Sequence, residues 1–147
     1  MRKQVCIGVL AMSFLASMLA GATASAKSVN NMKAQIPFDF QVGGQLIPAG
    51  EYIVTALSED DATLRISSGK KMAIALTTAK EAKVNSELRS RLVFHKYGDQ
   101  YFLVAVWGTD RTGRELPESK RERSLRKEMR VAQGGAAQAE VVTIAAQ

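Results

Sequence analysis

The residues best suited to chemistry lie in one short segment, which reads LVFHKYGDQYFLVAVW from Leu92 to Trp107. It contains His95, the only histidine of the chain, and Asp99 four residues later. An imidazole can act as a general base, and a nearby carboxylate can orient its ring. A small secreted hydrolase that uses His95 and Asp99 is therefore one hypothesis for this segment.

The same segment also predicts a hairpin, which weakens that hypothesis. Gly98-Asp99 has the pattern of a two-residue turn in which glycine supplies the positive φ of a type II′ turn. In this register His95 faces Phe102 from inside a strand, whereas Asp99 lies in the turn. No Gly-x-Ser-x-Gly motif marks a nucleophile that the histidine could activate. The simpler interpretation is that His95 fills a half-buried strand position and forms one hydrogen bond.

Three aromatic residues of the segment are candidates for binding sugars: Tyr97, Tyr101 and Trp107. The idea rests on an analogy with other exported β-sandwiches, at the level of the fold. Aromatic residues in a hairpin more often form cross-strand pairs and core contacts. We therefore expect these rings mainly to pack, with carbohydrate stacking as the alternative.

A second candidate site is a basic helix predicted over about residues 119–132. Ser119 and Glu122 have the spacing of a capping box, in which both side chains satisfy free N–H groups at the helix start. Leu125, Met129 and Ala132 form a narrow apolar stripe, and Leu125 and Met129 could dock it on a sheet. The cationic residues spread over the opposite side: Lys120, Arg123, Arg126, Lys127 and Arg130. Such a face could contact anionic lipid headgroups or acidic polysaccharide, although a solvated charged face is the usual role of a surface helix.

The composition offers little for a metal site. A zinc site needs several histidine or cysteine ligands, and the chain has one histidine and one cysteine, Cys6. The acidic cluster Glu59-Asp60-Asp61 lacks the spacing of an EF-hand loop and predicts a solvated turn. We expect neither a metal nor another cofactor.

The first 26 residues predict an export signal. Arg2 and Lys3 precede an uncharged run, Val5–Leu19, which is shorter than the about 20 residues of a membrane span. Ala24-Ser25-Ala26 then offers a small-x-small cleavage site. Residues 1–26 are thus expected to be a signal peptide, and residues 27–147 a single β domain in the periplasm or outside the cell. Cleavage would remove Cys6, so we expect no disulfide-linked partner, and export argues against nucleic acid as a partner.

Alternating apolar residues and short turns predict seven strands. The expected strands are Ala34–Val42, Glu51–Leu57, Thr63–Ser67, Lys71–Thr77, the two arms of the hairpin, and a terminal strand over about 139–146. Pro37 lacks an N–H, which favours a sheet edge for the first strand. Met72, Ile74 and Leu76 fall on one face of the fourth strand. With the helix, these strands predict a mainly β fold, either an antiparallel β-sandwich or a small barrel, with the hairpin at its centre.

The remaining segments, Lys80–Glu87 and Gly108–Gly113, are polar and rich in turn residues. We expect both to be connections, the first of them between two sheets, although a helical turn fits Lys80–Glu87 as well.

Three blocks carry a resemblance to known proteins: IPFDFQVGGQLIPAGEYIV, LVFHKYGDQYFLVAVW and GRELPESKRERSL. In this order, over about Ile36–Leu125, the chain resembles a group of small exported proteins that recurs in Acidobacteria. The resemblance implies a secreted, mainly β protein, and it brings with it no activity, cofactor or catalytic residue.

The sequence as a whole favours an exported, non-catalytic binding or structural protein of the cell envelope. The alternatives are the hydrolase that uses His95 and a barrel-type carrier of a small ligand. A concave pocket that joins His95 to an acid from another strand would favour the enzyme. A large apolar cavity would favour the carrier, and a flat or charged surface would favour the binding module.

Overall fold

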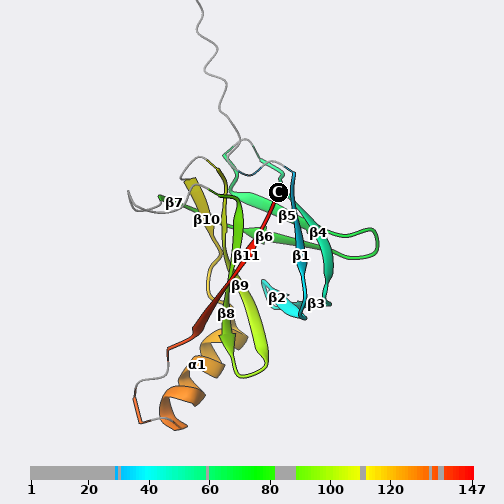
Figure 1. Ribbon diagram of the computed structural model, residues 1–147. Helices are drawn as coiled ribbons and strands as arrows, with labels where there is room; N and C mark the ends of the chain where they lie inside the picture. The colour runs from blue at the N-terminus through cyan, green and yellow to red at the C-terminus, as the bar shows by residue number, and fades with distance from the viewer. Residues whose placement is uncertain are drawn as a thin grey trace, which may run out of the picture.

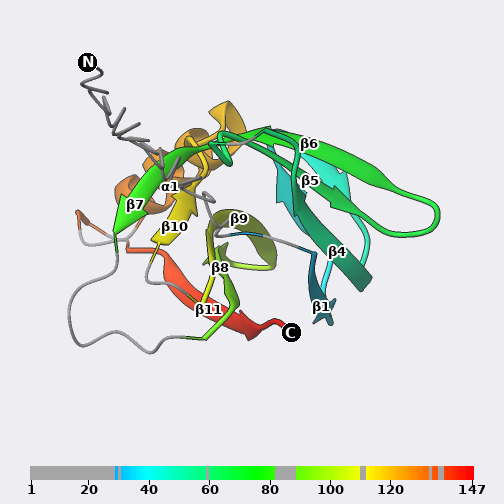
Figure 2. The same ribbon diagram turned by 90° about the horizontal axis from the view of Figure 1, so that it is seen from above.

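The computed structural model describes residues 29, 31–58, 60–81, 89–109, 112–132, 134–135 and 138–147. Within these ranges the chain is mainly β, with two sheets and one helix, and the sheets do not close into a barrel (Figures 1 and 2). The predicted fold class is confirmed. The predicted signal peptide, Glu59 and most of the segment Lys80–Glu87 lie outside the described residues.

The first sheet consists of four antiparallel strands in the order β1-β4-β5-β6. Their bounds are β1 Met32–Ile36, β4 Gly50–Ala56, β5 Thr63–Ser67 and β6 Met72–Leu76. The alternation read from the sequence places Leu64 and Ile66 of β5 in the core, both with 0% exposure. This sheet therefore buries one face, as period-two alternation requires.

The second sheet is built around the predicted hairpin. Its order is β11-β8-β9-β10-β7, and the β2–β3 hairpin joins it because β2 pairs in parallel with β9. The bounds are β2 Phe40–Val42, β3 Gln45–Ile47, β7 Thr78–Glu81, β8 Arg91–Tyr97, β9 Gln100–Trp107, β10 Thr112–Glu115 and β11 Glu140–Ala145. The hairpin register is as expected from Tyr97 opposite Gln100 to Phe94 opposite Leu103, beyond which a bulge shifts the pairing.

The expected strand Ala34–Val42 is in fact two strands that belong to different sheets. It breaks at Pro37, which cannot donate to a ladder, and β1 and β2 lie on either side of the break. Asp39 accepts a hydrogen bond from the backbone N–H of Ala49 at 2.8 Å, which stabilises the bend. The chain thus changes sheets at a residue for which the sequence had indicated only an edge position.

Two segments expected to be connections carry strands. Thr78–Glu81 forms β7, and Thr112–Glu115 forms β10, which pairs with both β7 and β9. At Gly113 an added Cβ would clash with the ring of Trp107, so the backbone of β10 runs directly over that ring. Only glycine leaves room for this close approach.

The two sheets are joined at two corners. At one corner the chain passes from β6 to β7 through Thr77, whose N–H donates to the carbonyl of Ala62 at 2.7 Å. At the other corner the backbones of Lys33 and Gln147 exchange hydrogen bonds of 2.7 and 2.9 Å. The core lies between the sheets, where the Phe40 ring meets those of Tyr52 and Phe94 edge to face, at 5.4 and 5.5 Å.

Helix α1, Lys120–Ala132, lies at the end of the β8–β9 hairpin (Figure 1). The N–H of Glu122 donates a hydrogen bond to the Ser119 hydroxyl oxygen at 3.1 Å, which is half of the predicted capping box. Gly135 caps the other end, where its N–H donates to the carbonyl of Arg130 at 2.9 Å. The helix within the described residues lacks the length and apolar character to cross a membrane.

Candidate functional site

A concave pocket opens where helix α1 meets the second sheet. Its volume is about 520 Å³, and we call it the helix–sheet pocket. Residues of β6, β7, β8, β9, β10 and α1 line it, together with Thr77 and the segment between β10 and α1. The apolar lining residues are Leu76, Val104, Leu116 and Pro117, and the polar ones are Thr77, Thr78, His95, Tyr97, Glu115, Glu118, Glu122 and Arg126. Leu116 is held against β9 because its N–H donates to the carbonyl of Val104 at 2.9 Å.

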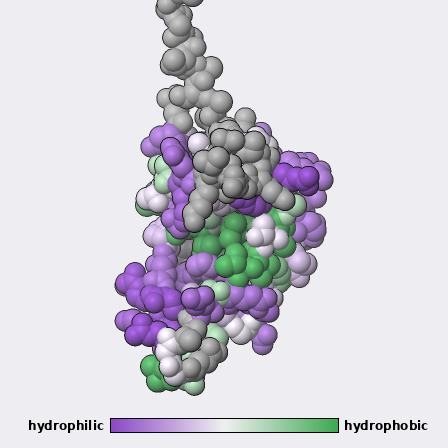
Figure 3. Space-filling view, turned by 60° about the vertical axis from the view of Figure 1, so that its left-hand side comes forward, coloured by the Kyte–Doolittle hydropathy of each residue, from purple (hydrophilic) through white to green (hydrophobic). Residues whose placement is uncertain are grey.

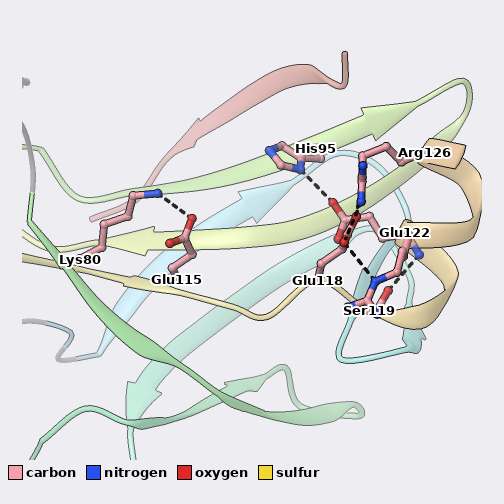
Figure 4. Close-up of polar contacts among 8 residues, drawn as sticks. Lys80, His95, Glu115, Glu118, Ser119, Glu122 and Arg126 are labelled. Atoms are coloured by element: carbon pink, nitrogen blue, oxygen red, sulfur yellow. Dashed lines mark hydrogen bonds and ion pairs between the residues drawn. The ribbon is translucent and has the colours of Figure 1, made fainter. Parts of the chain in front are cut away.

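The central polar contact of the pocket joins β8 to α1. His95 Nδ1 lies 2.8 Å from Glu122 Oε1, and the Glu122 side chain is 5% exposed while that of His95 is 36% exposed (Figure 4). An ionised carboxylate can only accept, so Nδ1 carries the proton of this bond. When the imidazole is neutral, the second ring nitrogen, Nε2, is then an acceptor. This pair is the arrangement that a base and its orienting acid would need, and it also fixes the helix to the sheet.

The helix docks differently from the prediction. Among the described residues of α1, only Glu122 is buried. Leu125 and Met129 of the expected apolar stripe are only half-buried. The Glu122 side chain does not complete the capping box but turns to His95. A charged contact therefore anchors the helix where apolar packing was expected.

A second polar cluster lies beside the first, around Glu118. Arg126 donates two hydrogen bonds to its carboxylate, at 2.8 and 3.2 Å, and Arg123 donates one at 3.3 Å (Figure 4). The hydrogen bonds from Arg126 lower the pKa of Glu118, against a smaller opposite effect of burial, and the same pairing raises the pKa of Arg126. Two of the five cations assigned to the basic face are thus paired within the chain.

Tyr97 supplies a neutral hydroxyl to the pocket. Burial is the main cause that raises the pKa of this phenol, followed by the negative charges of Glu122 and Glu118. The hydroxyl therefore stays protonated at neutral pH and remains a hydrogen-bond donor.

The candidate residues of the hairpin separate in the structure. Asp99 lies exposed in the turn, and the acid that contacts His95 is Glu122, which the sequence reading had treated only as a capping residue. Tyr97 is buried and meets Phe102 edge to face at 5.9 Å. Tyr101 stacks on Phe38 at 3.8 Å, and Arg91 lies 5.1 Å above the Trp107 ring. All three aromatic candidates thus have ring or cation partners inside the domain.

The rest of the basic face is exposed. Lys120, Lys127 and Arg130 form no ion pair with any described residue. Figure 3 shows hydrophilic side chains over the lower part of the molecule, at the height where α1 lies in Figure 1. No group of three or more histidine, cysteine, aspartate or glutamate side chains within the described ranges could hold a metal ion.

Glu122 was not identified from the sequence as the acid that contacts His95. The only local signal for Glu122 was its spacing from Ser119, which predicted a capping role. Its contact with His95 spans 27 residues and depends on where the helix docks. Glu118 carried no signal beyond its charge.

No family model, no curated protein and no solved structure matches the chain.

Proposed function

We propose that this chain is a non-catalytic binding protein of the cell envelope and that the helix–sheet pocket is its ligand site. The observation that carries the proposal is a concave pocket, where the sequence had led us to expect a flat or charged surface for a binding protein. Its volume of about 520 Å³ falls within the range of about 300–1,000 Å³ typical of small-molecule sites. Its walls combine apolar side chains with a few convergent polar groups, which is the usual composition of such sites. Export and envelope location rest on residues 1–26 and on the resemblance to exported proteins of Acidobacteria.

The charges around the pocket favour an uncharged ligand. Each acidic residue of the lining has a cationic or imidazole partner: Glu122 has His95, Glu118 has Arg126, and Glu115 has Lys80 at 2.6 Å. A charged ligand would have to compete with one of these pairs. An apolar molecule with one or two hydrogen-bonding groups would instead meet Leu76, Val104 and Leu116 on one side and the Tyr97 hydroxyl on the other.

Hydrolysis is the second candidate, because the His95–Glu122 pair joins the histidine to an acid of another element. That acid comes from the helix and not from a strand as expected. The pocket lining holds no serine or cysteine, and the Thr77 hydroxyl already donates to the carbonyl of Asp61 at 2.9 Å. The remaining nucleophiles are the Thr78 hydroxyl and a water molecule activated by Nε2. A binding function needs no such addition, so we place it first.

A screen of neutral fragments by ligand-observed NMR tests the proposal. Thr78→Trp places a large ring at the pocket lining and should weaken hits at least tenfold. Thr143→Trp, at an exposed position of β11 outside the pocket, is the matched control and should bind like wild type.

The same samples separate the alternatives. Hits that both tryptophan variants bind equally well would place the ligand outside the pocket and overturn the proposal. If a bound ester or amide is instead cleaved, and His95→Gln lowers the rate about a hundredfold or more with the fold intact, the protein is the hydrolase.

A further inference from the structure

One strand of the first sheet exposes its large apolar side chains and buries its small ones. On β6, Met72, Ile74 and Leu76 are 55%, 55% and 70% exposed, whereas Ala73 and Ala75 are 3% and 5% exposed. We call the three exposed residues the β6 stripe. A sheet with one solvated face normally shows the opposite pattern, with polar residues outward. A contiguous apolar stripe on a surface marks an interaction site.

One end of β6 lies beside β3. Gln45 of β3 donates from Nε2 to the carbonyl of Met72 at 3.4 Å, so β3 lies beside this end of the stripe. The next residue, Leu46, is 65% exposed.

Cations lie at both ends of the stripe. Lys70 and Lys71 are exposed in the turn that leads into β6. At the other end, Leu76 lines the helix–sheet pocket, which Glu122 and Arg126 of α1 also line. Figure 2 shows α1, β6 and the β5–β6 hairpin along one side of the molecule. The basic helix and the apolar strand therefore border the same face, with the mouth of the pocket between them.

We infer that this face docks on the surface of an anionic lipid bilayer. The β6 stripe would enter the zone between headgroups and acyl chains, while Lys70, Lys71 and the exposed cations of α1 would contact the headgroups. Binding of a protein at this interface grows with buried apolar area and with attraction to anionic lipid. This inference goes beyond the ligand site, because it needs no ligand in the pocket.

The combination of the two surfaces selects lipid over other partners. An acidic polysaccharide would use the cations but would leave three large apolar side chains in water. A second copy of the chain, packed through the same face, would bring like charges together at both ends of the stripe. A bilayer with anionic headgroups satisfies both parts of the face.

The test is co-sedimentation of the protein with phosphatidylglycerol-containing vesicles and with pure phosphatidylcholine vesicles, at low and at physiological salt. We expect binding to the anionic vesicles that weakens as salt rises, because the Debye length falls to about 8 Å at physiological ionic strength. Ile74→Thr/Leu76→Thr should weaken binding about tenfold, and Lys120→Gln/Lys127→Gln/Arg130→Gln should remove most of the salt dependence. Val141→Thr, at an apolar residue of β11 that is 61% exposed, is the matched control and should bind like wild type.

The substitutions to threonine place a β-branched side chain, which suits a strand, at exposed positions, so all variants should melt like wild type in circular dichroism. If wild type does not sediment with anionic vesicles, the inference fails. It also fails if Val141→Thr weakens binding as much as the double variant does. If sedimentation equilibrium without lipid shows a dimer that Ile74→Thr/Leu76→Thr dissociates, the face joins two copies of the chain. If the protein binds polygalacturonate, and only Lys120→Gln/Lys127→Gln/Arg130→Gln loses this binding, the partner of the helix is a polysaccharide and not a bilayer.

Discussion

Glu122 is the residue that fixes the helix to the sheet. Its side chain is 5% exposed, and a buried carboxylate is stable only when it is paired and hydrogen-bonded. His95 supplies that partner from β8 at 2.8 Å. The imidazole itself is 36% exposed, so water can replace its partner. The two residues of this bond should therefore respond differently when the other is lost.

We expect His95→Leu to lower the free energy of unfolding by about 3 kcal/mol, because it leaves the Glu122 carboxylate buried and unpaired. Glu122→Gln should lower it by only about 1 kcal/mol, since the amide oxygen still accepts the bond from Nδ1. His95→Gln, which can still donate to the carboxylate, is the control and should also stay within about 1 kcal/mol of wild type. Urea unfolding followed by circular dichroism measures all three. Equal losses for His95→Leu and Glu122→Gln would mean that the burial of Glu122 does not determine the stability of this contact.

At the scale of the element, the β8–β9 hairpin organises the second sheet. Gly98 has a φ of 59°, which is the positive value that the turn prediction required. An added Cβ there would meet no atom within 4 Å, so the constraint is conformational and not steric. Gly69, in the turn between β5 and β6, also has open space but has no positive φ. The two glycines therefore form a matched pair.

Gly98→Ala should lower the free energy of unfolding by about 1–2 kcal/mol, which is what a left-handed backbone costs a residue with a side chain. Gly69→Ala should raise it slightly, by about 0.5 kcal/mol, because alanine reduces the entropy of the unfolded chain. Thermal melts followed by circular dichroism show the sign of each change. Destabilisation of similar size in both variants would show that loss of glycine flexibility, and not the φ of Gly98, is what matters.

At the scale of the whole molecule, the two sheets are coupled where β6 turns into β7. Thr77 is 8% exposed, and its hydroxyl donates to the carbonyl of Asp61 at 2.9 Å in addition to the backbone bond to Ala62. Thr77, at this corner, also lines the helix–sheet pocket. The helix–sheet pocket and the connection between the sheets therefore share the same residue.

Thr77→Val keeps the shape of the side chain and removes the hydroxyl, so it should lower the free energy of unfolding by about 1–2 kcal/mol. The control is Thr55→Val. In wild type the Thr55 hydroxyl donates to Asn31 Oδ1 at 3.1 Å in an exposed position, so its loss should change the free energy of unfolding by less than about 0.5 kcal/mol. Trp107 fluorescence reports on the second sheet, and far-ultraviolet circular dichroism reports on both. The two signals should change together, and a Trp107 transition separate from that of the first sheet would mean that the sheets unfold independently.

The sequence by itself determined the features that depend on local geometry. The period of two along β4 and β5, the turn at Gly98, the register next to it and the helix between Ser119 and Ala132 all follow from contacts within a few residues. The predicted fold class follows from the number and spacing of these elements. The signal peptide and the envelope location stay predictions, because they concern residues outside those described.

Only the tertiary structure decided which surfaces meet. Alternation places Met72, Ile74 and Leu76 on one face of β6, but it cannot say which face the core covers, and the core takes the alanines. In the same way, the break at Pro37 sends β1 and β2 to different sheets. The acid that contacts His95 is 27 residues away, on a helix whose position depends on the whole second sheet. Contacts of this kind arise from long-range packing, and local periodicity carries no information about which partners it selects.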